Sequence, residues 1–171
     1  TNLTTPSLLI ASGQLTQGTN NVVNTINHNT GTWQLNVPVA INNYNLTNGE
    51  LRGANVIITN FNWLGGSLNS ENAGSNSVTI PPTGTLNISG ATAKSLSDYS
   101  GGNGRRLNHQ GTGTWRGAGI SCGHGPQFNN SGTLDLLGDF AFTFAGGTGA
   151  PQFNNTGILN LTSGADFSLT T

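Results

Sequence analysis

The chain has 171 residues, of which only 6% are charged, and its formal net charge is -1. Such a weakly charged surface does not attract DNA or anionic membranes, and no apolar run reaches the roughly 18 residues of a membrane span. A single cysteine, Cys122, excludes an intrachain disulfide framework. We expect one domain over residues 1–171, with no nucleic-acid partner and no membrane span.

The composition favours an all-β fold. Helix-forming residues are scarce, while Thr, Val, Ile and Asn are abundant between 26 glycines. Disorder is the rival interpretation of a chain rich in Gly, Asn and Ser. However, 33% of the residues are hydrophobic and they recur in order, so we expect a packed fold. The Asn- and Thr-rich surface indicates an extracellular or cell-surface location.

One short motif, Gly followed by any residue and then Leu or Trp, recurs from the start of the chain. Its glycines are Gly13, Gly31, Gly49, Gly66, Gly84, Gly113, Gly132 and Gly157. Their successive spacings are 18, 18, 17, 18, 29, 19 and 25 residues. A period near 18 in a β-rich chain is typical of a parallel β-solenoid, and the pattern predicts about eight coils of roughly 18–25 residues. The Leu or Trp of each motif should point into the core.

Two further short strands are expected in each coil. One alternates between inward and outward side chains, as at 37–41, 56–58, 78–80, 140–144 and 167–169. The other lies just before each glycine, at Ile26, Leu46, Trp63, Ile80, Phe128 and Phe153. Asparagines follow this strand, at Asn27, Asn108, Asn129–Asn130 and Asn154–Asn155. We expect these asparagines to form stacked turns that hydrogen-bond from coil to coil.

Several segments resemble repeats of large bacterial surface proteins. They are NWLGGSL at 62–68, IPPTGTLNI at 80–88, KSL at 94–96, GTW at 113–115, FNNSG at 128–132 and FNNTG at 153–157. Such repeats are associated with adhesin-like extracellular proteins, and the resemblance spans about residues 55–161. It implies a right-handed parallel β-helix. The chain departs from it at 97–106, where we expect a loop insertion that accounts for the spacing of 29 residues.

A catalytic site would require clustered chemistry on one face. The residues one and three places after each glycine should form two outward columns down one face. A polysaccharide-cleaving site needs two neighbouring acids, yet the only carboxylate three places after a glycine is Asp135. We expect Asp135 to form an exposed salt bridge with Arg116, one coil away. The Arg, Asn and Asp in the second column also disfavour an ice-binding array of threonines. Because the columns contain no pair of neighbouring acids, we expect that the protein is not an enzyme.

Metal and cofactor sites are not indicated. Cys122 and His124 offer two soft ligands, with His28 and His109 elsewhere, whereas a structural zinc takes four at close spacing. A buried thiol and ordinary polar histidines are the simpler interpretation. His28 and His109 both follow Asn, which suggests equivalent turns. We predict neither a metal nor a cofactor.

Four of the five basic residues fall within 23 residues of sequence, at Lys94, Arg105, Arg106 and Arg116. One interpretation is scattered surface charge. The other is an interaction patch, with Tyr99 as its aromatic anchor, that docks on an acidic surface of another subunit or on a glycan.

Six Asn-x-Ser/Thr tripeptides are possible glycosylation acceptors. They begin at Asn2, Asn45, Asn87, Asn129, Asn154 and Asn160. Because Asn, Ser and Thr are so frequent, the matches alone have little weight. The tryptophans, Trp33, Trp63 and Trp115, occupy repeat positions and are expected in the core rather than on a carbohydrate-binding surface.

Neither end of the sequence reads as a polar or helical cap, since TNLTTPSLLIASGQL and GADFSLTT both continue the repeat pattern. We expect either a slice of a longer solenoid or open ends through which identical subunits stack head to tail. The leading hypothesis is a non-catalytic extracellular structural protein, a subunit or segment of a surface fibre or adhesin stalk that assembles by end-to-end β-stacking. The alternative is a carbohydrate-binding or polysaccharide-cleaving β-helix.

Overall fold

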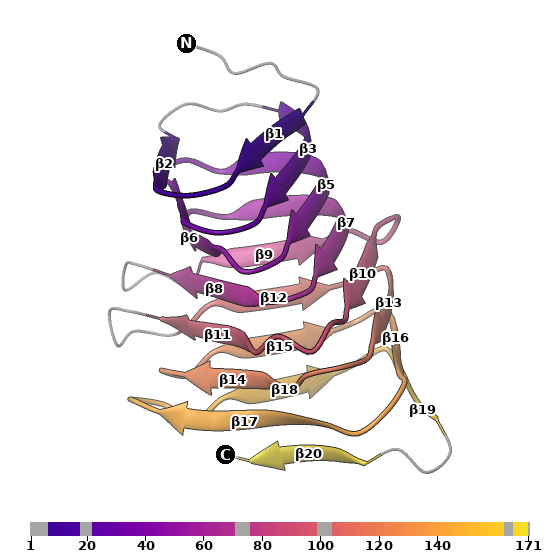
Figure 1. Ribbon diagram of the computed structural model, residues 1–171. Coiled ribbons are helices and arrows are strands. Elements are labelled where there is room, and N and C mark those ends of the chain that lie inside the picture. The colour runs from indigo at the N-terminus through magenta and orange to yellow at the C-terminus, as the bar shows by residue number, and fades with distance from the viewer. Residues whose placement is uncertain (1–6, 18–21, 71–75, 99–103, 163–165, 171) are drawn as a thin grey trace.

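The structure is a computed structural model that describes residues 7–17, 22–70, 76–98, 104–162 and 166–170. Over these residues the regular structure is entirely β, in two sheets whose strands all pair in parallel (Figure 1). Within the part described, no helix has the length and hydropathy that crossing a membrane requires. The predicted all-β class and the parallel pairing are confirmed.

One sheet contains twelve strands. They are β1 (Ser7–Ile10), β3 (Val22–His28), β5 (Val39–Leu46), β7 (Val56–Trp63), β9 (Ser77–Ile80), β10 (Thr85–Ile88), β12 (Arg106–His109), β13 (Thr112–Trp115), β15 (Gln127–Asn130), β16 (Thr133–Leu136), β18 (Gln152–Asn155) and β19 (Ile158–Leu161). The other sheet contains eight strands. They are β2 (Gln14–Gln17), β4 (Thr32–Leu35), β6 (Glu50–Gly53), β8 (Gly66–Ser70), β11 (Lys94–Asp98), β14 (Ile120–Gly123), β17 (Phe140–Gly146) and β20 (Phe167–Thr170).

The chain alternates between the two sheets, and each strand pairs with its equivalent one coil earlier or later, which is compatible with a β-solenoid. The number of strands per coil changes along the stack. β9 pairs with β7 at Val56 and Ile57, whereas β10 pairs with the last four residues of β7, 60–63. The segment PPTG at 81–84 separates β9 from β10, because proline cannot donate a hydrogen bond to a sheet. Among the described residues, three strands per coil are therefore found in the later part, where the stack in Figure 1 is wider.

The glycines of the repeated motif form two columns rather than the single predicted one. The first column lies at the corners that lead into the smaller sheet and contains Gly13, Gly31, Gly49 and Gly66. The second lies at corners within the larger sheet and contains Gly84, Gly132 and Gly157, together with Gly111, which is not a glycine of the motif. Gly113 does not belong to either column, because it pairs with Leu86.

Both columns exist for the same steric reason. A Cβ atom on Gly66 would lie 2.2 Å from the carbonyl oxygen of Gly49, and a Cβ atom on Gly132 would lie 2.1 Å from that of Gly111. Successive backbones therefore touch at both corners, and only glycine fits there. Both corners require glycine, so the same motif occurs at both. The sequence alone therefore does not distinguish the two columns.

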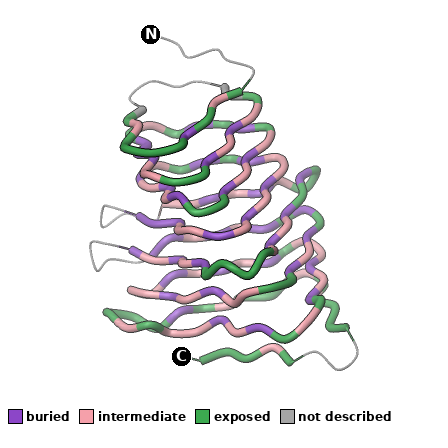
Figure 2. Tube along the Cα trace, in the orientation of Figure 1, coloured by how far each residue is buried: buried purple, intermediate pink, exposed green. Residues whose placement is uncertain are grey.

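Inward side chains form a continuous apolar core, which Figure 2 shows as buried positions repeating from coil to coil. The Leu or Trp of the motif is buried as predicted at Trp33, Leu51, Leu68, Leu86, Trp115 and Leu134. In the larger sheet, a column of buried residues in register contains Val39, Val56, Val78, Leu107 and Phe128. This core fixes the alternation of every strand and thereby decides which polar side chains reach the surface.

Candidate functional site

The outer face of the larger sheet carries ladders of polar side chains. In one ladder, Asn45 Nδ2 donates to Asn27 Oδ1 over 2.8 Å, and Asn62 Nδ2 donates to Asn45 Oδ1 over 2.7 Å. In the next coils Asn87 Nδ2 donates to Asn62 Oδ1 over 3.3 Å, and Thr114 Oγ1 donates to Asn87 Oδ1 over 3.2 Å. The predicted hydrogen bonds between coils are confirmed, but these residues lie within strands and not in turns.

A second ladder runs along the strands at the other side of the 81–84 corner. Asn108 Nδ2 donates to Thr79 Oγ1 over 3.4 Å, Asn129 to Asn108 over 2.8 Å, and Asn154 to Asn129 over 2.9 Å. Asn130, the next residue, is buried and belongs to the opposite face of the same strand. Both neighbouring asparagines hydrogen-bond from coil to coil, since Asn130 Nδ2 donates to Asn155 Oδ1 over 2.6 Å, but the pleat sends them to opposite sides of the strand.

Five of the six glycosylation tripeptides begin at residues of these ladders, and Asn2 lies outside the described residues. Glycosylation modifies the side-chain nitrogen of asparagine. In each of the five, Asn45, Asn87, Asn129, Asn154 and Asn160, this nitrogen donates to the side chain one coil earlier. Glycosylation at these positions stays a prediction.

The two outward columns predicted from the motif do not share one face, because the motif lies on both sheets. Arg52 is on β6 of the smaller sheet, where it forms a salt bridge of 2.5 Å with Glu50. Asp135 is on β16 of the larger sheet, beside Thr114, and accepts a hydrogen bond of 2.7 Å from Asn160. Among the described residues, Asp135 therefore extends a polar ladder and does not form the expected salt bridge with Arg116.

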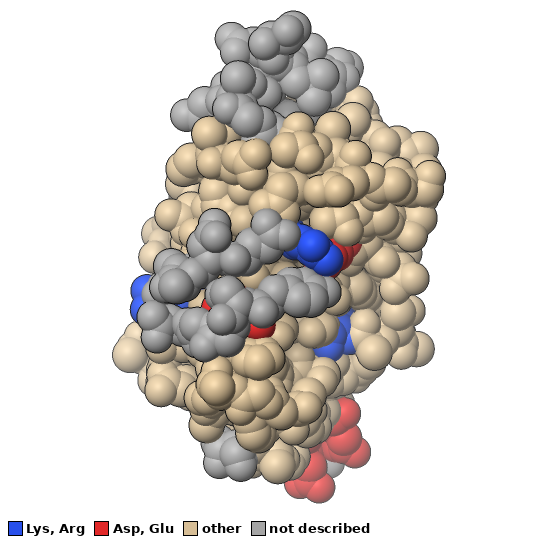
Figure 3. Space-filling view, turned by 90° about the vertical axis from the view of Figure 1, so that its left-hand side faces the viewer, with Lys and Arg blue, Asp and Glu red and all other residues tan. Residues whose placement is uncertain are grey.

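The five residues of the predicted interaction patch do not meet at the surface. Lys94 and Arg105 are buried, Arg106 is half-buried and Arg116 is exposed, while Tyr99 lies outside the described residues. Figure 3 shows Lys and Arg atoms at separate places on one side of the stack. A contact patch that includes Lys94 and Arg105 is therefore not formed, because alternation turns both side chains inward. Lys94 Nζ donates to the backbone carbonyls of Gly90 and Thr92, and burial lowers its pKa.

Arg105 is part of a polar group in the interior of the stack. Its guanidinium donates to the carbonyl of Gly53, and burial lowers its pKa to about 10 although it lies close to Tyr44. Tyr44 is fully buried and its hydroxyl donates over 2.8 Å to Nδ1 of His28. Burial raises the pKa of Tyr44, an effect that the Arg105 charge only partly opposes. At neutral pH the Arg105 cation therefore lies beside a neutral phenol in the core.

Replacing Arg105 with methionine is expected to be neutral or stabilising. Nε and Nη2 of Arg105 are buried and have no hydrogen-bond partner among the described residues. Replacing buried charges with apolar side chains of similar volume is often neutral or stabilises a protein by about 1–4 kcal/mol. The free energy of unfolding, measured with urea, checks this, and Arg106→Met on the half-buried neighbour is the matched control. A loss above about 1 kcal/mol in Arg105→Met alone would show that the cation holds the core together.

His28, His109 and Cys122 lie in the interior of the stack. His28 and His109 are the last residues of β3 and β12, and their side chains are buried. The prediction that they lie in equivalent turns is therefore wrong. Their Nε2 atoms lie 3.0 Å from the carbonyl of Gly31 and 3.1 Å from that of Thr133. Cys122 is buried, and burial raises the pKa of its thiol. Over the residues that the structure describes, no three His, Cys, Asp or Glu side chains are grouped to hold a metal.

The two buried histidines should make the protein less stable in mild acid. Burial lowers the pKa of both below 6.5, and hydrogen bonds to Gly31 and Thr133 only partly oppose this. Below pH 6.5 the unfolded chain therefore binds more protons than the folded one, so stability is full above pH 6.5 and declines as the pH falls through it. Urea unfolding at pH 8 and pH 5.5 checks the decline. NMR titration should show that both imidazoles become protonated at a lower pH than a free histidine does, and an ordinary or raised pKa for either would contradict the prediction.

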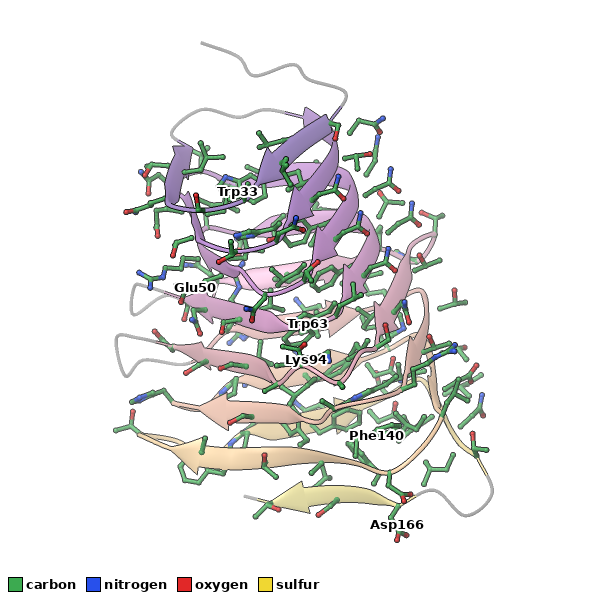
Figure 4. All side chains as sticks on the ribbon, in the orientation of Figure 1. Trp33, Glu50, Trp63, Lys94, Phe140 and Asp166 are labelled. Atoms are coloured by element: carbon green, nitrogen blue, oxygen red, sulfur yellow. The ribbon has the colours of Figure 1, made fainter. Side chains whose placement is uncertain are left out.

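Folding brings together two acids that are dispersed in the sequence. Asp139 and Asp166 precede Phe140 and Phe167, which pair in register, and the backbone amide of Asp166 donates to Asp139 Oδ1 over 2.8 Å. They line one side of a surface hollow of about 610 Å³ whose other walls are mainly Ala, Gly and Ser. Figure 3 shows acidic atoms gathered at this end, and Figure 4 places Asp166 beyond Phe140. The Asp-Phe pair repeated 27 residues apart was the available signal in the sequence.

The C-terminal end of the stack exposes apolar side chains and strand edges. In the described part, β18, β19 and β20 each pair with a strand on one side only. Leu161 and Leu169 are both 51% exposed, although the residues in register with them one coil earlier, Leu136 and Phe142, are buried. The sequences QFNN, ILNL and FSLT contain no charge and no proline, the usual guards of a free edge.

Comparison of the chain with protein-family models, with curated proteins and with solved structures finds no match. A function must therefore be inferred from the structure itself. Its candidate features are the polar ladders, the hollow beside Asp139 and Asp166, and the open strand edges at the C-terminal end.

Proposed function

We propose that the protein is a non-catalytic, extracellular structural element, a segment or subunit of a surface fibre or adhesin stalk. In this proposal its two parallel sheets are the sides of a right-handed β-helix of about eight coils, lengthened by end-to-end β-stacking. The observation that carries the proposal is the C-terminal edge, where β18–β20 present unpaired backbone groups without a charged or proline residue.

The side chains at this end support the same proposal. Leu161 and Leu169 are half-exposed, and covering the remaining half of each side chain with a further coil would stabilise by about 1 kcal/mol per residue. The outer face of the larger sheet, by contrast, carries Asn and Thr ladders whose side chains hydrogen-bond to one another within the stack. Growth along the axis is therefore favoured over lateral association.

Electron microscopy and sedimentation of the isolated chain test this function. We expect filaments or end-to-end oligomers whose width equals one stack, with a length that increases with concentration. Immunolabelling of intact cells of the source organism should place the protein outside the cell. A chain that stays monomeric at every concentration tested would contradict the self-assembling form of the proposal.

The hollow beside Asp139 and Asp166 favours a second candidate, carbohydrate binding. Its size suits a short glycan segment, and paired carboxylates accept hydrogen bonds from sugar hydroxyls. A glycan array, repeated with Asp139→Asn and with Asp135→Asn as the control outside the hollow, tests it. Binding that is lost only in Asp139→Asn would support this function, and the absence of binding to any glycan would remove it.

A further inference from the structure

Two stacked corners of the smaller sheet are joined by an ionisable side chain. The first corner is the segment GHGP at 123–126, after β14, and the second is the segment 147–150, which follows β17 one coil later. They lie at the left-hand ends of these two strands in Figure 1. We propose that His124 is a pH-sensitive switch: its neutral imidazole holds the 147–150 segment against the preceding coil, and protonation of the imidazole releases that segment. The switch lies within the stack and depends neither on assembly nor on glycan binding.

The imidazole accepts a hydrogen bond from the later corner. The backbone N–H of Thr148 donates to His124 Nδ1 over 3.3 Å, and the Thr148 hydroxyl lies 3.5 Å from the same nitrogen. A backbone N–H can only donate, so Nδ1 must be unprotonated and the ring neutral. An imidazolium carries hydrogen on both ring nitrogens and would set one N–H against another. The hydrogen bond from Thr148 therefore requires the neutral form of the ring.

The ring also packs on a stretch of backbone that has no side chain. A Cβ atom on Gly147 would lie 2.6 Å from Nδ1 and Cε1 of His124, so the imidazole lies directly on this backbone. In addition, the backbone N–H of His124 donates to the carbonyl of Gly146 over 3.3 Å. The side chain and the main chain of one residue thus hold the start of the later corner.

The backbone conformation at His124 is unusual and places the ring for this contact. Its φ of 61° lies in the left-handed region, and among the described residues no other residue except glycine has a positive φ. Such a conformation is costly for a residue with a Cβ atom and persists where surrounding contacts hold it. The pairing of β14 with β17 also shifts register here, since Cys122 pairs with Phe144 and Gly123 with Gly146. Irregularities of this kind re-aim the residues that follow them.

The 147–150 segment can move without disturbing the core. All four of its residues are exposed, and Gly147 and Gly149 have positive φ values. The strand before it, β17, is held by its pairing with β14 and β20. Release of the corner should therefore leave both sheets intact.

Two neighbouring elements bring other charged groups towards this corner. They are β11, which pairs with β14, and the segment before β12, where a Cβ atom on Gly104 would lie 2.3 Å from the carbonyl oxygen of Gly125. Their charged residues are Lys94, Asp98, Arg105 and Arg106. Neither β17 nor the 147–150 segment contains a titratable side chain. A variant that keeps all four charged residues and removes only the imidazole therefore separates its titration from theirs.

Hydrogen exchange of the Thr148 amide tests the switch. The reference is the Ala118 amide, which donates over 3.0 Å to the carbonyl of Gly90 at another corner and reports opening of the stack as a whole. Between pH 8 and pH 5, the range in which histidines ordinarily change charge, protection of Thr148 relative to Ala118 should fall about tenfold or more. Correction for the intrinsic effect of pH on exchange is applied to both amides.

His124→Asn is the matched variant. Asparagine adopts the left-handed conformation readily, and its Oδ1, bonded to Cγ as Nδ1 is, accepts a hydrogen bond at either pH. Relative protection of Thr148 should therefore be the same at pH 8 and pH 5. His124→Ala has no acceptor and should leave Thr148 equally unprotected at both.

NMR titration of the native protein gives a second measure that needs no variant. The amide signal of Thr148 should shift with the same midpoint as the imidazole of His124. A different midpoint would overturn the switch. So would a relative protection that stays constant in the native protein, or one that falls as far in His124→Asn.

Discussion

Gly132→Ala is expected to destabilise the protein by about 3 kcal/mol or more, the upper end of the range for overpacked interiors. A Cβ atom on Gly132 would lie 2.1 Å from the carbonyl oxygen of Gly111. The clash is with backbone, so no side-chain rotation can relieve it and neighbouring coils must separate. Urea unfolding followed by circular dichroism measures the loss.

Gly123→Ala is the matched control for this change. The nearest atom to a Cβ on Gly123 is the side-chain hydroxyl of Ser97 at 2.8 Å, and the nearest backbone atom is 3.5 Å away. The hydroxyl can rotate away with the loss of its 3.1 Å hydrogen bond to the Gly123 carbonyl, so the unfolding free energy should fall by only about 1 kcal/mol. Equal losses in both variants would show that the corner contact is not what requires glycine at Gly132.

Trp115→Ala is expected to cost about 3–5 kcal/mol, as for other fully buried large aromatic residues. The indole lies 5.3 Å from the ring of Phe140 and 6.0 Å from that of Phe128, nearly parallel to both, and meets Phe167 edge-on at 5.6 Å. Removing it opens a cavity between coils that the rigid strands cannot close. The same unfolding experiment measures the effect.

Trp115→Phe separates loss of the ring stack from loss of the tryptophan hydrogen bond. Phenylalanine keeps an aromatic ring in the stack but loses the donation from Nε1 to the carbonyl of Ala118 over 3.3 Å. We expect a clearly smaller loss than in Trp115→Ala. An alanine variant as stable as the phenylalanine variant would show that the later coils repack freely around this position.

Much of the fold could be predicted because its determinants are local. Alternating apolar residues specify strands, and glycine before Leu or Trp specifies a corner followed by an inward side chain, as at Gly31–Trp33 and Gly132–Leu134. The same regularity misled the prediction at Gly113, which pairs with Leu86 although its tripeptide matches the motif. Local sequence identifies the corner, but pairing across coils decides the register.

The candidate sites were less predictable than the fold. Lys94 and Arg105 are charged, and composition alone favours exposed positions for such residues, yet the register places both in the interior. Asp139 and Asp166 are 27 residues apart and meet only because β17 and β20 pair. Contacts between residues of neighbouring coils depend on the number of residues in each coil. That number varies after the point where the two strands β9 and β10 pair with the single long strand β7.

The amino-acid sequence alone determined the all-β class, the burial of the Leu and Trp residues of the motif and the hydrogen-bonded asparagines, because each depends on residue type and short spacing. Only the tertiary structure decided which sheet each motif joins and which basic residues are buried. The physical reason is that a parallel sheet pairs residues about one coil apart, and the length of that coil is set by packing across the whole stack.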